Sequence, residues 1–278
     1  MANRIVLLDN GSLRADATLS LRRLADGLGE RLGETVHPVS LLHSSKIPAE
    51  ELGGVAAWTW RRFLRKQLES GAAEFAIVPL FFGPSSAIVD YLPKVTREVL
   101  GDAGGRVRVA APLVNWEDED DDDMAAILHD LLIRKMDTPG DASPPAVVLV
   151  DHGSPIREVA RCRDLVAKQL GKRLGPRAKR VVAASMERRE GDEYAFNEPL
   201  LERALSELAE AGESRLALSY LFFSPGRHAG PGGDIDAILA NSPWATEGRS
   251  LVKAPLVGES PLLLNLLERR YRELEGGT

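Results

Sequence analysis

An internal duplication constrains the fold of this 278-residue chain more than any other feature. The stretch IVLLDNGS at residues 5–12 is nearly repeated as VVLVDHGS at residues 147–154. Two further pairs follow in the same order, PLFFGPSS with YLFFSPGR and AAPLV with KAPLV, at offsets of 141 to 143 residues. Self-similarity over so long a period indicates two similar structural units in one chain.

Each half alternates short apolar runs with segments of helical periodicity. The runs lie at residues 5–8, 36–42, 75–82 and 107–114 in the first half, and at 147–150, 181–186, 216–223 and 250–257 in the second. Predicted helices between and after them include residues 55–68, 124–136, 200–208 and 262–274. Strands that alternate with helices predict parallel sheets covered on both faces. We therefore expect an α/β fold of two tandem similar halves, each a parallel four-stranded sheet flanked by helices.

The boundary between the halves is predicted from composition. The stretch DTPGDASPPA at residues 137–146 contains the proline and glycine that break both helices and strands. The sequence therefore predicts a first half at residues 1–136, a linker at 137–146 and a second half at 147–278.

Charge and cysteine content exclude several classes of protein. The formal net charge of −6 argues against a nucleic-acid partner. Cys162 is the only cysteine, which excludes a disulfide framework, a zinc knuckle and an iron–sulfur site and indicates a reducing compartment. No apolar run reaches the roughly 18 residues of a membrane helix. We expect a cytoplasmic monomer or homodimer without a membrane partner.

Three side chains of metal-ligating types follow three neighbouring strands of the second half. His152 follows the first strand, Glu187 ends the second and His228 follows the third. Ligands of open parallel sheets bind outside the carboxyl ends of the strands, so these side chains are expected in one site. Two imidazoles and a carboxylate suit divalent cobalt, nickel, iron or zinc. Imidazoles with near-neutral pKa values also accept protons.

Glycines and arginines surround this predicted site. Gly153 and Gly226 are expected to permit tight turns beside a ligand, and the glycines of residues 230–233 predict an open loop that admits something large and flat. Arginines at the strand ends can bind carboxylates through forked hydrogen bonds. The candidate substrate-binding residues are Ser154, Arg157, Arg188, Gly226 and Arg227.

Several other residues allow two interpretations. Asp234 and Asp236 either bind metal or start a helix, and the second is favoured. The acidic run at residues 117–123 likewise favours a helix start over a metal site. Asp151 either orients His152 or satisfies the amides of its turn. His43 falls close to the place that Glu187 takes in the second half.

The second half resembles the sirohydrochlorin chelatases of the CbiX/SirB type. The matching stretches are VVLVDHGSP, SMERREGDE and YLFFSPGRHAGPGGDID. Members of this family are class II chelatases, which insert cobalt or iron into a tetrapyrrole. The resemblance covers residues 146–275 clearly and residues 3–136 as a degenerate copy. It implies two similar α/β halves that face each other with the active site between them.

This resemblance also implies an activity and its residues. The chain is expected to be a lyase of siroheme or cobalamin biosynthesis that inserts a metal into sirohydrochlorin or a related anionic tetrapyrrole without ATP. Co²⁺, Fe²⁺ or Ni²⁺ is then the substrate, and no organic cofactor is expected. His152, His228 and Glu187 become both the metal ligands and the catalytic residues, and the nearby arginines meet the carboxylates of the tetrapyrrole.

The chain departs from the family in its first half. The paired histidines of long, two-halved members sit in the first half, where this chain has Asn10, Ser85 and Ser86. A non-catalytic metal- or tetrapyrrole-binding protein of the same fold is therefore the alternative. A histidine-based phosphate-ester hydrolase is disfavoured, because Asp151 precedes His152 and repels a phosphate.

Overall fold

The chain forms two compact units, which are described separately. The computed structural model describes residues 3–72, 74–101, 106–136, 143–246 and 248–277. The first unit comprises Met1–Leu113 and Pro261–Thr278, and the second comprises Val114–Ser260.

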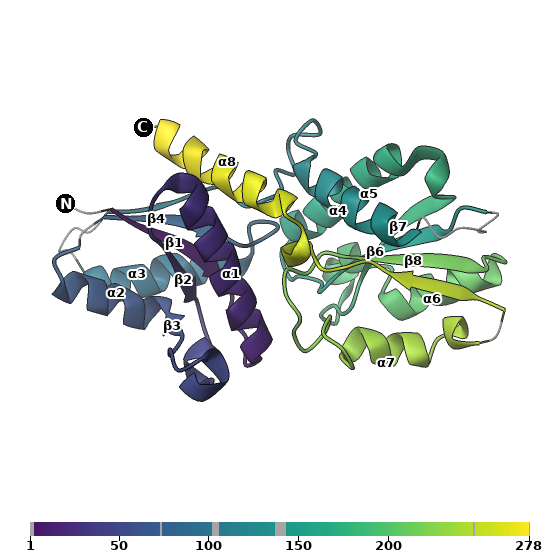
Figure 1. Ribbon diagram of the computed structural model, residues 1–278. Helices are drawn as coiled ribbons and strands as arrows, with labels where there is room; N and C mark the ends of the chain where they lie inside the picture. The colour runs from purple at the N-terminus through teal and green to yellow at the C-terminus, as the bar shows by residue number, and fades with distance from the viewer. Residues whose placement is uncertain (1–2, 73, 102–105, 137–142, 247, 278) are drawn as a thin grey trace. The chain divides into compact units, whose positions relative to one another are not determined.

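The first unit is a parallel sheet between two pairs of helices. Its strand order is β3-β2-β1-β4-β5. The strands are β1 (Asn3–Asp9), β2 (Val36–Ser40), β3 (Trp58–Thr59), β4 (Glu74–Pro79) and β5 (Arg106–Val109). One face packs against α2 (Trp60–Glu69) and α3 (Leu92–Leu100), where Val6 and Leu8 of β1 meet Trp60, Phe63 and Leu92. The other face carries α1 (Ala15–Leu32) and α8 (Leu262–Gly276), which lie side by side (Figure 1).

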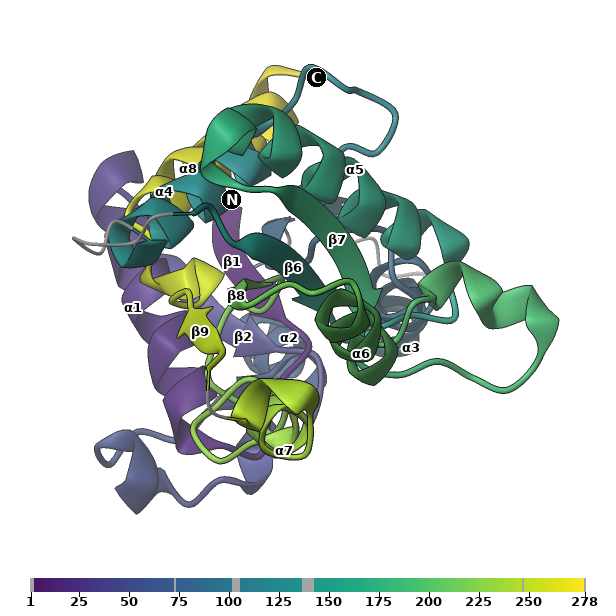
Figure 2. The same ribbon diagram turned by 90° about the vertical axis from the view of Figure 1, so that its right-hand side faces the viewer.

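The second unit repeats this arrangement with four parallel strands in the order β7-β6-β8-β9. The strands are β6 (Ala146–Asp151), β7 (Arg180–Ser185), β8 (Arg215–Tyr220) and β9 (Ser250–Lys253). Alternate residues of β6, such as Val148 and Val150, face α6 (Leu201–Glu210) and α7 (Asp234–Ala240). Helices α4 (Asp123–Met136) and α5 (Arg157–Leu174) pack together on the opposite face (Figures 1 and 2). A short 3₁₀-helix, η5 (Asp192–Asn197), follows β7 and contacts α5.

The predicted α/β class and the parallel sheets are confirmed, but the first sheet has five strands rather than four. The fifth is β3, which has only two residues and runs directly into α2. The start of the predicted helix at residues 55–68 is therefore extended chain, and the helix itself begins at Trp60. A two-residue strand is too short to produce the alternation that identifies a strand in a sequence.

The compact units and the predicted halves differ in one helix each. Helix α4 ends the first half of the sequence but packs with α5 in the second unit, and α8 ends the second half but packs with α1 in the first unit. An amphipathic helix presents an apolar stripe that either of two similar sheets can accept. Residues 137–142 of the predicted linker lie outside the described residues, and Ala146 already belongs to β6.

The acidic run precedes α4, as the helix-start interpretation predicted. It also pairs with α5: Glu119 lies 2.8 Å from Lys168, and Asp122 lies 2.8 Å from Arg173. These carboxylates therefore join the segment that precedes α4 to helix α5.

None of the helices in the described part of the chain is long and apolar enough to cross a membrane. The cytoplasmic location, the absence of a nucleic-acid partner and the oligomeric state stay predictions.

Candidate metal centre

The ends of β6 and β7 carry His152 and Glu187 side by side. Asp151 and Ser185, the last residues of the two strands, are paired. The backbone pairing continues beyond them, because Met186 N donates to Asp151 O at 2.9 Å and Glu187 N donates to His152 O at 3.2 Å. The two backbones are thus fixed next to each other where the sheet ends.

His228, from the loop after β8, completes the predicted set. The ring centroids of His152 and His228 are 4.6 Å apart, with the ring planes inclined at 72°. His152 Nε2 lies 3.5 Å from Glu187 Oε1. The structure therefore brings together all three residues that the strand-end rule singled out.

These side chains are accessible and not yet arranged around an ion. The His152 and Glu187 side chains are 48% and 66% exposed, whereas His228 is 24% exposed. Within the described residues, no three His, Cys, Asp or Glu side chains already form a metal-binding cluster. To share one ion, the exposed His152 and Glu187 side chains have to rotate.

A carboxylate partner of His228 was missed at the sequence level. Asp234 Oδ2 lies 2.8 Å from His228 Nδ1, although not aligned as a hydrogen bond, and 3.2 Å from Arg227 Nε. Helix α7 begins at Asp234, directly after the N-cap residue Gly233, so the helix-start interpretation is confirmed, and Asp234 also lies beside the histidine. Asp236 accepts a hydrogen bond from Gly232 N and pairs with Lys253. A carboxylate at Nδ1 favours a proton there and leaves the Nε2 lone pair of His228 for a metal.

The glycine predictions have opposite outcomes. Gly153 has φ of 91°, and a Cβ there would lie 1.9 Å from Glu187 O, so the tight turn is confirmed. Gly226 does not need to be glycine, because the nearest atom to a Cβ would be Ser224 O at 3.9 Å.

The glycine-rich loop at residues 226–233 is compact rather than open. A Cβ on Gly230 or Gly233 would lie 2.5 Å from a backbone oxygen of the same loop. Gly230 N donates to Gly226 O, and Asp234 N donates to Arg227 O. The glycines let the loop fold onto itself, which places His228 beside Asp234.

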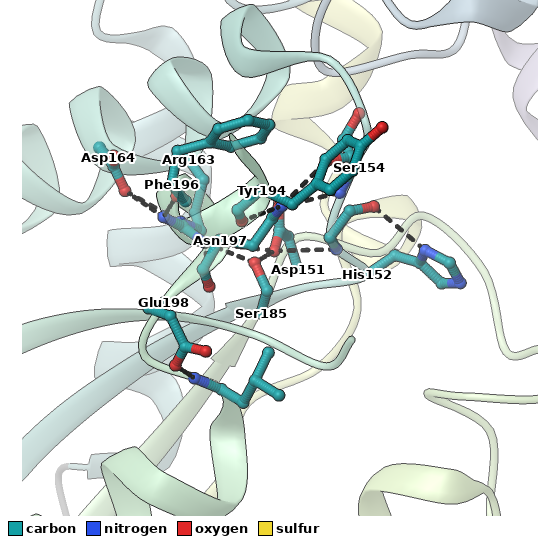
Figure 3. Close-up of polar contacts among 12 residues, drawn as sticks. Asp151, His152, Ser154, Arg163, Asp164, Ser185, Tyr194, Phe196, Asn197 and Glu198 are labelled. Carbon is teal, nitrogen blue, oxygen red and sulfur yellow. Dashed lines mark hydrogen bonds and ion pairs between the residues drawn. The ribbon is translucent and has the colours of Figure 1, made fainter. Parts of the chain in front are cut away.

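Asp151 satisfies turn amides, the second of its two interpretations. It accepts hydrogen bonds from Gly153 N at 3.1 Å and from the Ser185 hydroxyl at 2.6 Å. Burial raises the pKa of Asp151, and the positive charge of Arg163 opposes that rise. In Figure 3 the His152 ring points away from this buried group, with Nδ1 3.2 Å from Gly153 O.

Most of the predicted substrate-binding side chains already have partners. Arg157 stacks on the Phe196 ring at 4.6 Å, and Arg188 pairs with Glu198 at 2.7 Å. The Ser154 hydroxyl accepts a hydrogen bond from Ile156 N at the start of α5. Arg227, the chain neighbour of His228, is 80% exposed, although its Nε lies 3.2 Å from Asp234 Oδ2. It is thus the best placed of them to meet an anionic substrate.

The corresponding edge of the first unit has different side chains. Leu42 N donates to Asn10 O at 3.1 Å, as Glu187 N donates to His152 O. Leu42, and not His43, therefore occupies the place of Glu187. His43 is exposed and directly precedes a short 3₁₀-helix, Ser44–Lys46.

Asp9 is the first-unit counterpart of Asp151 and lacks a matching cation. It accepts hydrogen bonds from the Ser40 hydroxyl and from Gly11 N, while its Oδ1 is buried without a hydrogen-bond partner among the described residues. Helix α1 has Leu21 where α5 has Arg163. Burial raises the pKa of Asp9 from 3.8 to about 6.

We expect the wild-type protein to become less stable as the pH rises, because the buried Asp9 ionises. The Asp9→Asn variant should not show this decrease. Because the folded-state pKa exceeds the unfolded value, the stability that Asp9 contributes is complete below pH 3.8 and is lost as the pH rises through about 6. The shift corresponds to roughly 3 kcal/mol in the free energy of unfolding. Urea unfolding at several pH values measures it, with Asp26→Asn on the exposed face of α1 as control. Parallel pH profiles of wild type and Asp9→Asn would contradict this assignment.

The comparisons with known proteins agree with this architecture. Residues 146–274 match the family model described as CbiX. No curated protein sequence matches the chain. SirB from Bacillus subtilis with Fe³⁺ is 18% identical with a TM-score of 0.70, and the match covers 100% of this chain and 98% of that one.

Two further solved structures are similar over most of the chain. The sirohydrochlorin chelatase SirB from Bacillus subtilis subspecies spizizenii in complex with cobalt is 16% identical, with a TM-score of 0.67 over 99% of this chain and 97% of that one. CbiX, named as the terminal enzyme of siroheme biosynthesis in denitrifying bacteria, is 16% identical, with a TM-score of 0.63 over 97% and 98%. The fold is thus that of the class II chelatases. Residues 146–274 thus match the CbiX family, and the whole chain has the fold of the SirB and CbiX structures.

Proposed function

We propose that this protein inserts divalent cobalt or iron into sirohydrochlorin or a related anionic tetrapyrrole without ATP. The observation that carries the proposal is the convergence of His152, Glu187 and His228 at three strand ends of a CbiX-family unit. The similar structures of a SirB with Fe³⁺ and a SirB in complex with cobalt support iron and cobalt as the metals.

The three residues supply the chemistry that metal insertion requires. A tetrapyrrole loses two pyrrole N–H protons as the metal enters the ring, so a catalyst has to deliver the ion and accept protons. In this proposal His152 and His228 hold the ion through imidazole nitrogens, and Glu187 is the third ligand. Once the ion has passed to the ring, the imidazole nitrogens that held it are free to accept the two released protons.

The surrounding side chains are proposed to hold the carboxylates of the tetrapyrrole. Arg227 is exposed beside His228 and forms forked hydrogen bonds with such groups. Arg157 and Arg188 are exposed at the ends of β6 and β7, and their present contacts leave guanidinium N–H groups for a ligand. Ser154 and Gly226 are proposed to contact the substrate from the two adjoining loops.

A spectroscopic assay tests the proposal. Purified protein is given Co²⁺ or Fe²⁺ together with sirohydrochlorin, and the visible absorption of the pigment is followed against a protein-free control. We expect the spectral change of metal insertion to be faster with protein. Equal rates with and without protein for every divalent metal tested would reject the function.

A carrier of metal or tetrapyrrole without turnover is the second candidate. The specific observation in its favour is that the exposed ligands do not form a ready cluster in the described part of the chain. Calorimetric titration with Co²⁺, run beside the assay, distinguishes the two functions. Binding without any acceleration identifies a carrier, and binding with acceleration identifies a chelatase.

A further inference from the structure

A buried arginine lies beneath the ends of β6 and β7. Arg163 of α5 is only 2% exposed. Its guanidinium donates to the carbonyl oxygens of Phe196 and Asn197 at 3.0 and 3.2 Å and to the Ser185 hydroxyl (Figure 3). Asp151 Oδ1 lies 3.8 Å from Nη1. One buried cation therefore joins α5, the end of β7 and the short helix η5.

Asn197 joins η5 to the turn that follows His152. Its side chain is fully buried. Ser154 N donates to Asn197 Oδ1 at 3.0 Å, and Asn197 Nδ2 donates back to Ser154 O at 2.9 Å. The same Nδ2 donates to Tyr194 O at 3.1 Å. Arg163 and Asn197 together, here called the Arg163–Asn197 lock, fix the two loops that carry His152 and Glu187.

The exposed ligands depend on such a fixed backbone. Side-chain packing does little to hold His152 and Glu187, because their side chains are 48% and 66% exposed. Burying a guanidinium is costly, and apolar residues of similar volume often give equal or greater stability. A buried arginine at this position therefore suggests that a particular loop geometry has to be maintained.

The first unit provides a comparison within the same chain for Arg163. Helices α1 and α5 each have 18 residues, from Ala15–Leu32 and Arg157–Leu174. Leu21 is the seventh residue of α1, and Arg163 is the seventh residue of α5. The fold therefore accepts leucine at this position.

The counterpart of Asn197 follows from the strand pairing. The last residue of β2 pairs with Thr59, and Ser185, the last residue of β7, bridges to Leu200. Ala56 and Asn197 lie three residues before these partners. The first unit thus has leucine and alanine where the second has the lock.

A cavity of about 200 Å³ in the first unit is lined in part by Leu21, Ser40 and Ala56. That unit also has Asn10 and Leu42 at the places of His152 and Glu187. The lock and the ligands are therefore present together in one unit and replaced together in the other.

We propose that Arg163 and Asn197 are positioning residues that hold His152 and Glu187 where both reach the same divalent ion. They do not touch the ion themselves. The inference rests on the proposed function only in treating the ion as a substrate. Its test requires metal binding alone.

The test replaces each lock residue with its first-unit counterpart, as Arg163→Leu and Asn197→Ala. Calorimetry measures the Co²⁺ affinity, and visible absorption of bound Co²⁺ reports its ligands, both without tetrapyrrole. Residues that orient metal ligands typically contribute about 10- to 100-fold to affinity, and we expect a loss of that size with an altered Co²⁺ spectrum. Arg173→Leu, also on α5 but ion-paired with Asp122 at the surface, is the matched control and should bind normally.

The outcomes separate this inference from the proposed function. A folded Arg163→Leu or Asn197→Ala protein with wild-type Co²⁺ affinity and spectrum would overturn the positioning role. If the Arg163→Leu protein does not fold, the Co²⁺ affinity and spectrum of the Asn197→Ala protein decide whether the positioning role holds. A wild-type protein that binds Co²⁺ but does not insert it would reject the chelatase function, and the affinities of the variants would still decide the inference. Failure of the wild-type protein to bind Co²⁺ would overturn the positioning role.

Discussion

Substitution of His228 with alanine is expected to slow metal insertion by about 100-fold or more while leaving the fold intact. The imidazole is proposed to bind the ion and to accept a pyrrole proton, and general-base catalysis alone typically contributes factors of 10² to 10⁴. His228 is 24% exposed and lies in a loop held by its own backbone hydrogen bonds, so its loss should affect stability little. The measurement is the initial rate of the sirohydrochlorin spectral change, with circular dichroism as a check of folding.

Two companion variants complete this experiment. His152→Ala should lose a comparable factor, because its ring centroid lies 4.6 Å from that of His228 and both are proposed to bind one ion. His43→Ala is the matched control, since this exposed histidine belongs to the first unit. Full activity in His228→Ala together with loss in His43→Ala would move the site to the first unit.

Gly153→Ala is expected to have the largest effect on stability of any single methyl addition in the second unit. The residue has φ of 91°, and the added carbon would lie 1.9 Å from Glu187 O, so one of the two loops has to move. Backbone strain of this kind costs about 1 to 3 kcal/mol, and the steric conflict adds to it. We expect the free energy of unfolding to fall by roughly 3 kcal/mol or more.

A second glycine distinguishes the energetic cost of the left-handed backbone conformation from the cost of the steric clash. Gly212 has φ of 78°, but a Cβ there would meet no atom within 4 Å. Gly212→Ala should therefore show the cost of the left-handed conformation alone, about 1 kcal/mol. Urea unfolding of both variants measures the difference. Equal decreases in the free energy of unfolding for Gly153→Ala and Gly212→Ala would show that the close approach to Glu187 does not contribute to the destabilisation.

The order of strands and helices was predictable because it depends on local patterns. Apolar runs of strand length, helical periodicity and a repeated Asp-x-Gly-Ser turn are all visible in the sequence, and the structure confirms two parallel sheets. The assignment of α4 and α8 to the opposite units was not predictable. Both helices are amphipathic, and nothing in an apolar stripe specifies which of two similar sheets it covers.

The proposed metal ligands could be identified from sequence position, whereas the residues that support them could not. His152, Glu187 and His228 follow strands, and the rule that places ligands at strand ends applies to sequence position alone. Asp234 and Asn197 act through contacts between loops, which a sequence does not display. Arg163 left one signal: it is a charged residue directly after Cys162 in the buried stripe of α5. A charge in such a stripe indicates a buried polar partner, here Asp151 and Ser185.

Anomalous diffraction from crystals of the protein soaked with Co²⁺ locates the bound ion directly. We expect a cobalt peak about 2.1 Å from the Nε2 atoms of His152 and His228, with a Glu187 carboxylate oxygen as a third ligand. A peak at the acidic run of residues 117–123, at His43, or at neither histidine of the second unit would contradict it.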